Sequence, residues 1–211
     1  MVAKPEVPAS QKGSPMFTAL TLAAVALAAA TTGYILFVLI ADLYTNGSGD
    51  RVIVDVETTG LDAHTERIIE VAMVRVDRFG REVRRFVTLI NPNRDTGAEH
   101  IHGITTAMVA GAPTFDMIAT NVAAMMKGAT FVAHNVSFDL PFLIVELHRA
   151  GVKAPKVPTF CTLATARLMF TEGRHNLKAT AERFGISVPL SHRAEADAEI
   201  TLAIFRRMTG E

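Results

Sequence analysis

Two acidic residues interrupt an apolar, β-branched stretch and limit what this chain can fold into. Residues 52–56 have the composition of a buried strand, and a Thr-Thr-Gly turn signal follows them. Asp55 and Glu57 are two positions apart, so on a strand both point to one face near its carboxyl end. Burying two like charges side by side is costly unless a cation neutralises them. The alternative is that the strand ends earlier and both acids are solvated.

Composition excludes several classes of protein. The 211 residues include Lys+Arg 21 and Asp+Glu 21, so the formal net charge is zero, which argues against a histone-like polycation or an acidic disordered tail. Hydrophobic residues make up 49% of the chain, enough for a packed core. The single cysteine, Cys161, cannot form an internal disulfide, so burial must hold the fold together.

The amino-terminal part differs from the rest. We expect residues 1–15, with three prolines, to be a disordered lead. Residues 17–41 are 25 consecutive positions without a charge or a proline. A helix of that length spans roughly 37 Å, more than the ~30 Å hydrocarbon core of a bilayer. We therefore predict a single transmembrane helix over residues 16–41 that inserts in a lipid bilayer, and a short linker over residues 42–50. A cleaved signal peptide and a buried core helix are the alternatives.

Residues 51–211 have the size of one domain and read as an α/β fold. Strands are expected at 52–56, 68–76, 82–90, 129–133 and 157–163, and helices at 116–127, 137–150, 176–184 and 193–208. Three strands in a meander, followed by strands that alternate with helices, predict a mixed five-stranded sheet flanked by helices.

A second polar cluster, His134-Asn-Val-Ser-Phe-Asp139, lies between the fourth strand and a helix. Ser137 is the expected N-cap, which places Asp139 in the first helical turn, where the backbone dipole favours a carboxylate. Taken alone, an acid at this position usually serves only to stabilise the helix.

A third cluster, His192-Arg-Ala-Glu-Ala-Asp197, begins the last helix. Positions five apart differ by about 140° around a helix, so His192 and Asp197 cannot share a helical face. They could meet a common target if His192 precedes the helix and Asp197 points inward from it. Otherwise they are a solvated histidine and a surface acid.

Taken in order, the motifs Asp55-Val-Glu-Thr-Thr-Gly, Glu99-His-Ile-His-Gly-Ile104, His134-Asn-Val-Ser-Phe-Asp139 and His192-x4-Asp197 resemble the DEDDh 3′–5′ exonucleases. This family includes the proofreading epsilon subunit of bacterial DNA polymerase III and ribonuclease T. The resemblance covers about residues 51–209. It implies a ribonuclease H-like fold and an exonuclease domain over 51–211, which agrees with the expected order of strands and helices.

The resemblance also implies a mechanism. Asp55, Glu57, Asp139 and Asp197 match the four metal ligands of the family, and His192 matches the general base. Carboxylate oxygens suit Mg²⁺ or Mn²⁺, and two such ions would assist hydrolysis of the phosphodiester at a 3′ end of DNA or RNA, releasing nucleoside monophosphates. An imidazole can accept the proton of the attacking water near neutral pH.

The same resemblance indicates where a single-stranded 3′ end binds. The matching positions are Thr58, Leu61, Ile101, His102 and Phe138. Leu61, Ile101 and Phe138 could instead be core residues. Arg81, Arg84 and Arg85 could extend a nucleic-acid track, although a solvated strand face is the simpler interpretation.

Two alternatives keep the fold and change the role. A catalytically silent module would bind nucleic acid or a polymerase, although all four acids are present. A proofreading subunit would need a polymerase-docking tail, and the chain ends soon after its last helix. For the membrane orientation, two lysines before the apolar segment favour an exported domain, whereas nucleic-acid substrates favour the cytoplasmic side. We expect a cytoplasmic catalytic domain.

Overall fold

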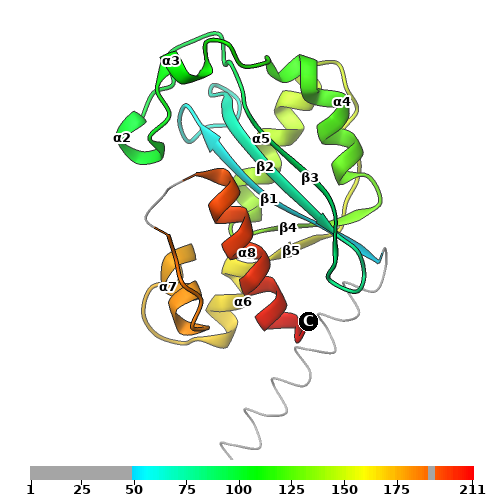
Figure 1. The fold of residues 1–211 in the computed structure, drawn as a ribbon, viewed down its shortest axis with the longest axis vertical. Helices are drawn as coiled ribbons and strands as arrows, with labels where there is room; N and C mark the ends of the chain where they lie inside the picture. Colours follow the sequence, from blue (N-terminus) through cyan, green and yellow to red (C-terminus); the bar gives the residue numbers. More distant parts are fainter. Residues whose placement is uncertain (1–48, 190–192) are drawn as a thin grey trace, which may run out of the picture. The chain divides into compact units, whose positions relative to one another are not determined.

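The computed structural model describes residues 49–189 and 193–211, which form a sheet with helices on both faces (Figure 1). The strands, in sequence order, are β1 (Asp50–Thr58), β2 (Ile68–Val76), β3 (Glu82–Leu89), β4 (Ala129–Ala133) and β5 (Thr159–Cys161). The helices are α2 (Glu99–His102), α3 (Thr106–Val109), α4 (Phe115–Met126), α5 (Val136–Arg149), α6 (Thr162–Met169), α7 (Leu177–Arg183) and α8 (Ala194–Thr209).

The sheet is mixed and five-stranded, as the sequence predicts. Its order is β3-β2-β1-β4-β5. The first three strands are an antiparallel meander, and β4 and β5 run parallel to β1. The predicted fifth strand over 157–163 is shorter, because Thr162 already begins α6. The four-residue helices α2 and α3, and α6, were not expected from the sequence pattern.

The period of two along β1 separates a core face from a site face. Val52, Val54 and Val56 pack in the main apolar cluster with α4 and α5 residues such as Phe115 and Leu143. The intervening side chains of β1 point to the opposite face, which α8 crosses (Figure 1). The sheet therefore has a dry face under α4 and α5, and a second face shared with α8.

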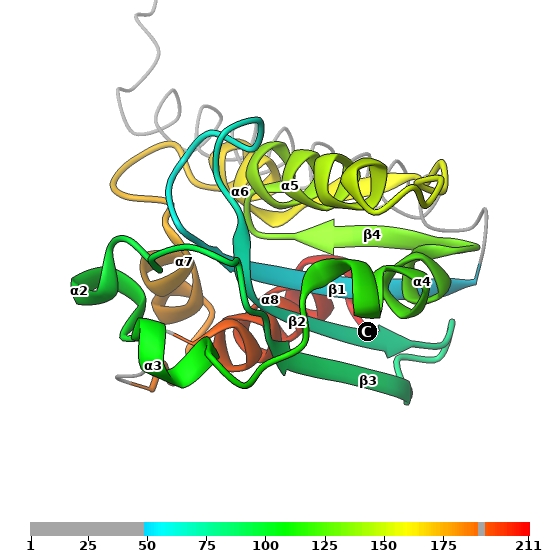
Figure 2. The same cartoon turned by 90° about the horizontal axis from the view of Figure 1, so that it is seen from above.

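The carboxyl end of β1 extends past its neighbour. β4 pairs with β1 only from Asp50 to Ile53, whereas β1 continues to Thr58. Figures 1 and 2 place α2 and α7 beyond this end of the sheet. The last residues of β1 thus lack a strand on the β4 side, and their groups on that edge are open to side chains from other elements.

The loop after β1 is fastened at two places. Arg67 donates two hydrogen bonds to the buried Glu146 of α5, at 2.5 and 3.0 Å. Gly97 has a left-handed backbone (φ 79°), and a Cβ there would lie 2.4 Å from the carbonyl oxygen of Thr59. Glycine is required at this contact, which brings the segment before α2 against the end of β1.

The predicted lead (1–15) and transmembrane helix (16–41) lie outside the described residues, as does the linker up to residue 48; β1 begins at Asp50, inside the predicted linker. Within 49–189 and 193–211, no helix is long and apolar enough to cross a membrane.

Candidate metal centre

Three carboxylates converge at the carboxyl end of β1. One oxygen each from Asp55, Glu57 and Asp197 lies within 4.8 Å of the others. Asp55 and Glu57 share a face of β1, and Asp197 belongs to the first turn of α8. β1 continues to Thr58, so the alternative of a strand that ends before these acids is wrong. The structure therefore brings the first and third sequence clusters together.

Small residues and a buried acid set the position of α8. Ala194 and Ala198 are fully buried, which lets the start of the helix approach the sheet closely. Glu70 of β2 pairs with Glu57 in the strand register and is buried. Its carboxylate accepts hydrogen bonds from the Nε of Arg193 (3.0 and 3.1 Å) and from the backbone N–H of Ala194 (3.0 Å). Glu70 thus caps α8 and holds its first turn against β1.

Asp139 reaches the site from the other helix layer. Its Oδ1 accepts the backbone N–H of Val56 at 3.2 Å, on the edge of β1 that β4 leaves unpaired. The side chain is buried and lies in the first turn of α5, as predicted. Asp139 is not in the set of three mutually close carboxylates, but its charge raises the pKa of Asp55. The second cluster therefore adjoins the other two.

The predicted N-cap of α5 is wrong. The cap is Asn135, whose carbonyl oxygen accepts the N–H groups of Phe138 and Asp139 at 2.8 and 3.3 Å. The helix therefore begins before Ser137, whose hydroxyl donates to the Asn135 side chain at 2.7 Å. The position of Asp139 in the first turn is unaffected.

The site holds its carboxylates in an environment that favours protonation. Burial, followed by repulsion from Asp139, Asp197 and Glu57, raises the pKa of Asp55 well above its usual value. Burial also raises the pKa of Glu57 to about 8, with Asp197 as the next cause. For Asp139, burial raises the pKa to about 7, although the N–H of Val56 opposes this change.

This donor set fits hard divalent cations. Arg193 lowers the pKa of Glu57, but its guanidinium is already engaged with Glu70. The carboxylates at this site keep raised pKa values even with Arg193 nearby. A bound cation would supply the positive charge that stabilises their ionised form. Carboxylate oxygens are hard ligands, and the group of close ligand atoms found among the described residues includes no cysteine.

His192 lies outside the described residues. The helix that carries Asp197 begins at Ala194, so His192 precedes it in the chain, as the 140° argument requires.

The predicted substrate residues differ in their exposure and in their contacts. Leu61 and Ile101 are 87% and 61% exposed, so neither is a core residue. Phe138 is partly buried and its ring lies 5.0 Å from that of Phe142, so it does pack against the core. Thr58 is buried and donates to the carbonyl oxygen of Gly60 at 2.6 Å.

His102 is buried, and its Nδ1 accepts the N–H of Ile104 at 3.0 Å. Burial lowers the pKa of this imidazole, so the ring is neutral at physiological pH.

Sequence reasoning missed Glu70 and Arg193. Glu70 is the one acid within the apolar run 68–76, which is a signal, but its meaning depends on the register that places it beside Glu57. Two arginines of the possible nucleic-acid track are engaged in ion pairs. Arg85 pairs with Glu82, Glu195 and Glu199, and Arg81 pairs with Asp77. Arg85 on β3 and Arg81 in the turn before it are therefore occupied by carboxylates, and Arg84 lies exposed on β3.

Comparison with known proteins identifies relatives for this arrangement. The family model described as Exonuclease (RNase T) matches residues 52–205. The chain is 38% identical over 159 residues to the 3′-5′ exonuclease DinG of Bacillus subtilis (strain 168), covering 73% of this chain and 17% of DinG. It is also 38% identical over 159 residues to DNA polymerase III subunit epsilon of Treponema pallidum (strain Nichols), covering 73% of this chain and 74% of that subunit.

Solved structures share the fold. Exonuclease X in complex with 5′ overhanging duplex DNA is 28% identical with a TM-score of 0.59, covering 75% of this chain and 90% of that one. A structure of exonuclease I has a TM-score of 0.68 at 17% identity, covering 77% of this chain and 42% of that one. At that identity, the likeness to exonuclease I concerns the fold alone.

The raised carboxylate pKa values predict how stability depends on pH and metal. A carboxyl whose pKa is higher in the folded state loses stabilisation as pH rises toward that pKa. Without metal, the melting temperature should therefore fall between about pH 6.5 and pH 8, the folded-state pKa of Glu57. Below about pH 6.5 the lowered pKa values of His102 and His134 make stability rise with pH, which opposes the effect of the carboxylates. Added Mn²⁺ should raise the melting temperature most at the upper end of this window, because it binds ionised carboxylates.

Thermal unfolding with EDTA or with Mn²⁺ measures this behaviour. Glu57→Gln should flatten the metal-free fall and reduce the Mn²⁺ effect, whereas Glu82→Gln, at an exposed ion pair, should leave both unchanged. A metal-free melting temperature that rises from about pH 6.5 to 8 would show that the carboxylates are not held as described.

Proposed function

Because this chain belongs to the exonuclease family, we propose that it hydrolyses phosphodiester bonds stepwise from the 3′ ends of DNA or RNA and releases nucleoside monophosphates. The observation that carries this proposal is the convergence of Asp55, Glu57 and Asp197 within 4.8 Å at the end of β1. The 38% identity to the 3′-5′ exonuclease DinG supports this direction of attack. Because this chain spans a small part of DinG, the activity is inferred for the matched domain.

The proposal assigns two divalent cations to four carboxylates. Asp55, Glu57 and Asp197 would be ligands, and Asp139 would complete the set from the first turn of α5. Bound cations would polarise the scissile phosphate and make the attacking water more acidic. The hydrogen bond from the N–H of Val56 orients the Asp139 carboxylate, which is the role of an outer partner of a metal ligand.

His192 is proposed as the general base. An imidazole with an ordinary pKa near 6.5 accepts a proton from water close to neutral pH. Its chain neighbour, Arg193, is anchored to the buried Glu70, and Ala194 is capped by the same carboxylate. This anchor fixes where the chain enters α8.

The terminal nucleotide is proposed to bind at two exposed apolar residues, Leu61 after the end of β1 and Ile101 on α2. Leu61 and Ile101 are large, exposed and apolar, as expected of side chains that contact a base face. Thr58, His102 and Phe138 would line the inner side of this position. Exonuclease X bound to 5′ overhanging duplex DNA supports the class of substrate, and such contacts to sugar, phosphate and base faces give little sequence preference.

A nuclease assay tests the proposal. With Mg²⁺ or Mn²⁺, the purified chain should shorten 5′-labelled single strands one nucleotide at a time, and matched DNA and RNA strands would reveal its preference. Asp55→Asn should reduce the rate at least ~100-fold, since it removes a metal ligand. Asp116→Asn, at an exposed acid in the first turn of α4, is the matched control and should stay near wild type.

Labelled mononucleotide released first from the 5′ end would exclude the proposed polarity. Strands that bind equally to wild type and Asp55→Asn, and that neither protein digests, would instead identify a silent binding module.

We also propose that the apolar segment 17–41 tethers this domain to a membrane with the catalytic part on the cytoplasmic side. The support is the length of the uncharged run, which exceeds the hydrocarbon thickness. The full chain should sediment with membranes, deletion of 17–41 should move it to the soluble fraction, and a carboxyl-terminal reporter should be active inside the cell. A soluble full chain would refute the tether, and a reporter active outside would reverse the orientation.

A further inference from the structure

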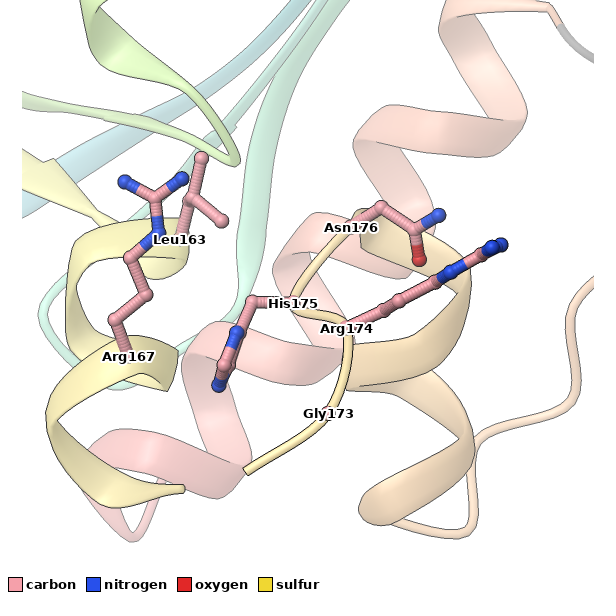
Figure 3. Close-up of a pocket in the computed structure, with 6 residues that line it drawn as sticks. All are labelled: Leu163, Arg167, Gly173, Arg174, His175 and Asn176. Carbon is pink, nitrogen blue, oxygen red and sulfur yellow. The ribbon is translucent and has the colours of Figure 1, made fainter. Parts of the chain in front are cut away.

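A hollow lies between α6 and the segment that leads into α7 (Figure 3). Its volume is about 450 Å³. The lining residues are Leu163, Arg167, Gly173, Arg174, His175 and Asn176. None of these is acidic, and the one acid of the segment 163–178, Glu172, is not among them. The hollow is therefore suited to an anionic group.

The two arginines of this hollow are available for a ligand. Both Arg167 and Arg174 are exposed, and neither forms an ion pair within the described parts of the chain. By contrast, Arg85 and Arg193 are engaged with carboxylates. Figure 3 shows Arg167 on α6 beside Leu163, whereas Arg174 extends from the connecting segment toward α7. Both residues line the hollow, and their guanidinium groups point in different directions and do not converge on one point.

The hollow is built on a fixed hydrogen-bonded frame. His134 follows β4 directly, and its ring nitrogens contact Thr162 Oγ1 and the carbonyl oxygen of His175, both at 2.9 Å. The ring of His175 contacts the carbonyl oxygen of Phe170 at 2.8 Å. These bonds tie α6 and the segment before α7 to the end of β4, so the spacing across the hollow is set by the fold.

This frame also connects the hollow to the carboxylates. His134 and Asp139 are five residues apart, on either side of the start of α5. β1, β4 and β5 are parallel, so their carboxyl ends lie at one edge of the sheet. Figures 1 and 2 both place α7 at this edge. A strand whose 3′ end lies at Asp55 and Asp197 can therefore continue along the edge to the hollow.

We propose that this hollow binds phosphodiester groups of the substrate strand on the 5′ side of the bond that is cleaved, through Arg167 and Arg174. The proposal rests on the exonuclease function proposed above. Guanidinium groups bind phosphate through paired hydrogen bonds and keep their charge at all physiological pH values. Cations on two sides of a hollow suit an extended polyanion better than one small anion. Contacts of this kind hold any sequence equally well.

The test compares substrates that do and do not reach the hollow, using the full chain. One substrate is a single-stranded oligonucleotide, and the other is the p-nitrophenyl ester of thymidine 5′-monophosphate, which has a single nucleotide. Arg167→Ala/Arg174→Ala should lower kcat/KM on the oligonucleotide ~10-fold or more, because charged hydrogen bonds are lost. It should leave the ester unaffected, which also shows that the variant is folded. The slope of log K for oligonucleotide binding against log salt concentration should become less steep by about 1.4, which corresponds to the loss of two phosphate contacts.

Arg78→Ala/Arg207→Ala is the matched control. It removes the same charge from exposed positions, in the turn after β2 and in the last turn of α8. This variant should behave as wild type on both substrates.

Three results would overturn the assignment. Oligonucleotide turnover equal to that of the control would show that the hollow is not used. An equal loss on both substrates would indicate a structural role. A change confined to inhibition by free thymidine 5′-monophosphate would assign the hollow to the released nucleotide. If wild type cleaves neither substrate, the exonuclease proposal fails separately, and fluorescence anisotropy with a labelled strand still decides whether Arg167 and Arg174 bind it.

Discussion

Like-charged carboxylates crowded at the end of one strand are the constraint on which the rest of this structure depends. Asp55 and Glu57 share a face of β1, and Asp197 comes within 4.8 Å of them. Burial and mutual repulsion raise the pKa values of Asp55 and Glu57. Without a metal ion, these carboxyl groups must therefore stay protonated, or their mutual repulsion destabilises the fold. The fold accepts this unfavourable arrangement, which is a property of functional sites.

Several features serve to maintain that arrangement. β1 continues beyond β4, so the N–H of Val56 is free to orient Asp139. Small residues bring α8 close to the sheet, and Glu70 caps that helix while binding Arg193. Both Asp139 and Asp197 lie in first helical turns, where backbone N–H groups offset part of the negative charge. Each feature contributes to one geometry at the carboxyl edge.

Much of the fold follows from local patterns. The apolar runs 68–76 and 129–133 are buried strands with the predicted bounds, because a strand buried on both faces is apolar throughout. The period of two placed Asp55 and Glu57 on one face. The four-residue helices α2 and α3 have too few residues to show a helical period, and the cap at Asn135 depends on backbone geometry that several nearby polar residues could supply.

The remaining parts of the site depend on contacts between distant segments. The β1–β2 register places Glu70 beside Glu57. The unpaired edge of β1 lets the N–H of Val56 bind Asp139. Leu61 and Ile101 are apolar yet exposed, and composition alone could not separate them from core residues. Arg167 and Arg174 gain significance because α6 begins directly after β5, and the segment before α7 lines the same hollow.

The most direct test of this account is anomalous diffraction at the manganese absorption edge from crystals of the chain soaked in Mn²⁺. Two anomalous peaks are expected, bounded by the carboxylates of Asp55, Glu57, Asp139 and Asp197. Crystals in which Mn²⁺ scatters elsewhere, with those four side chains free of any ion, would contradict it.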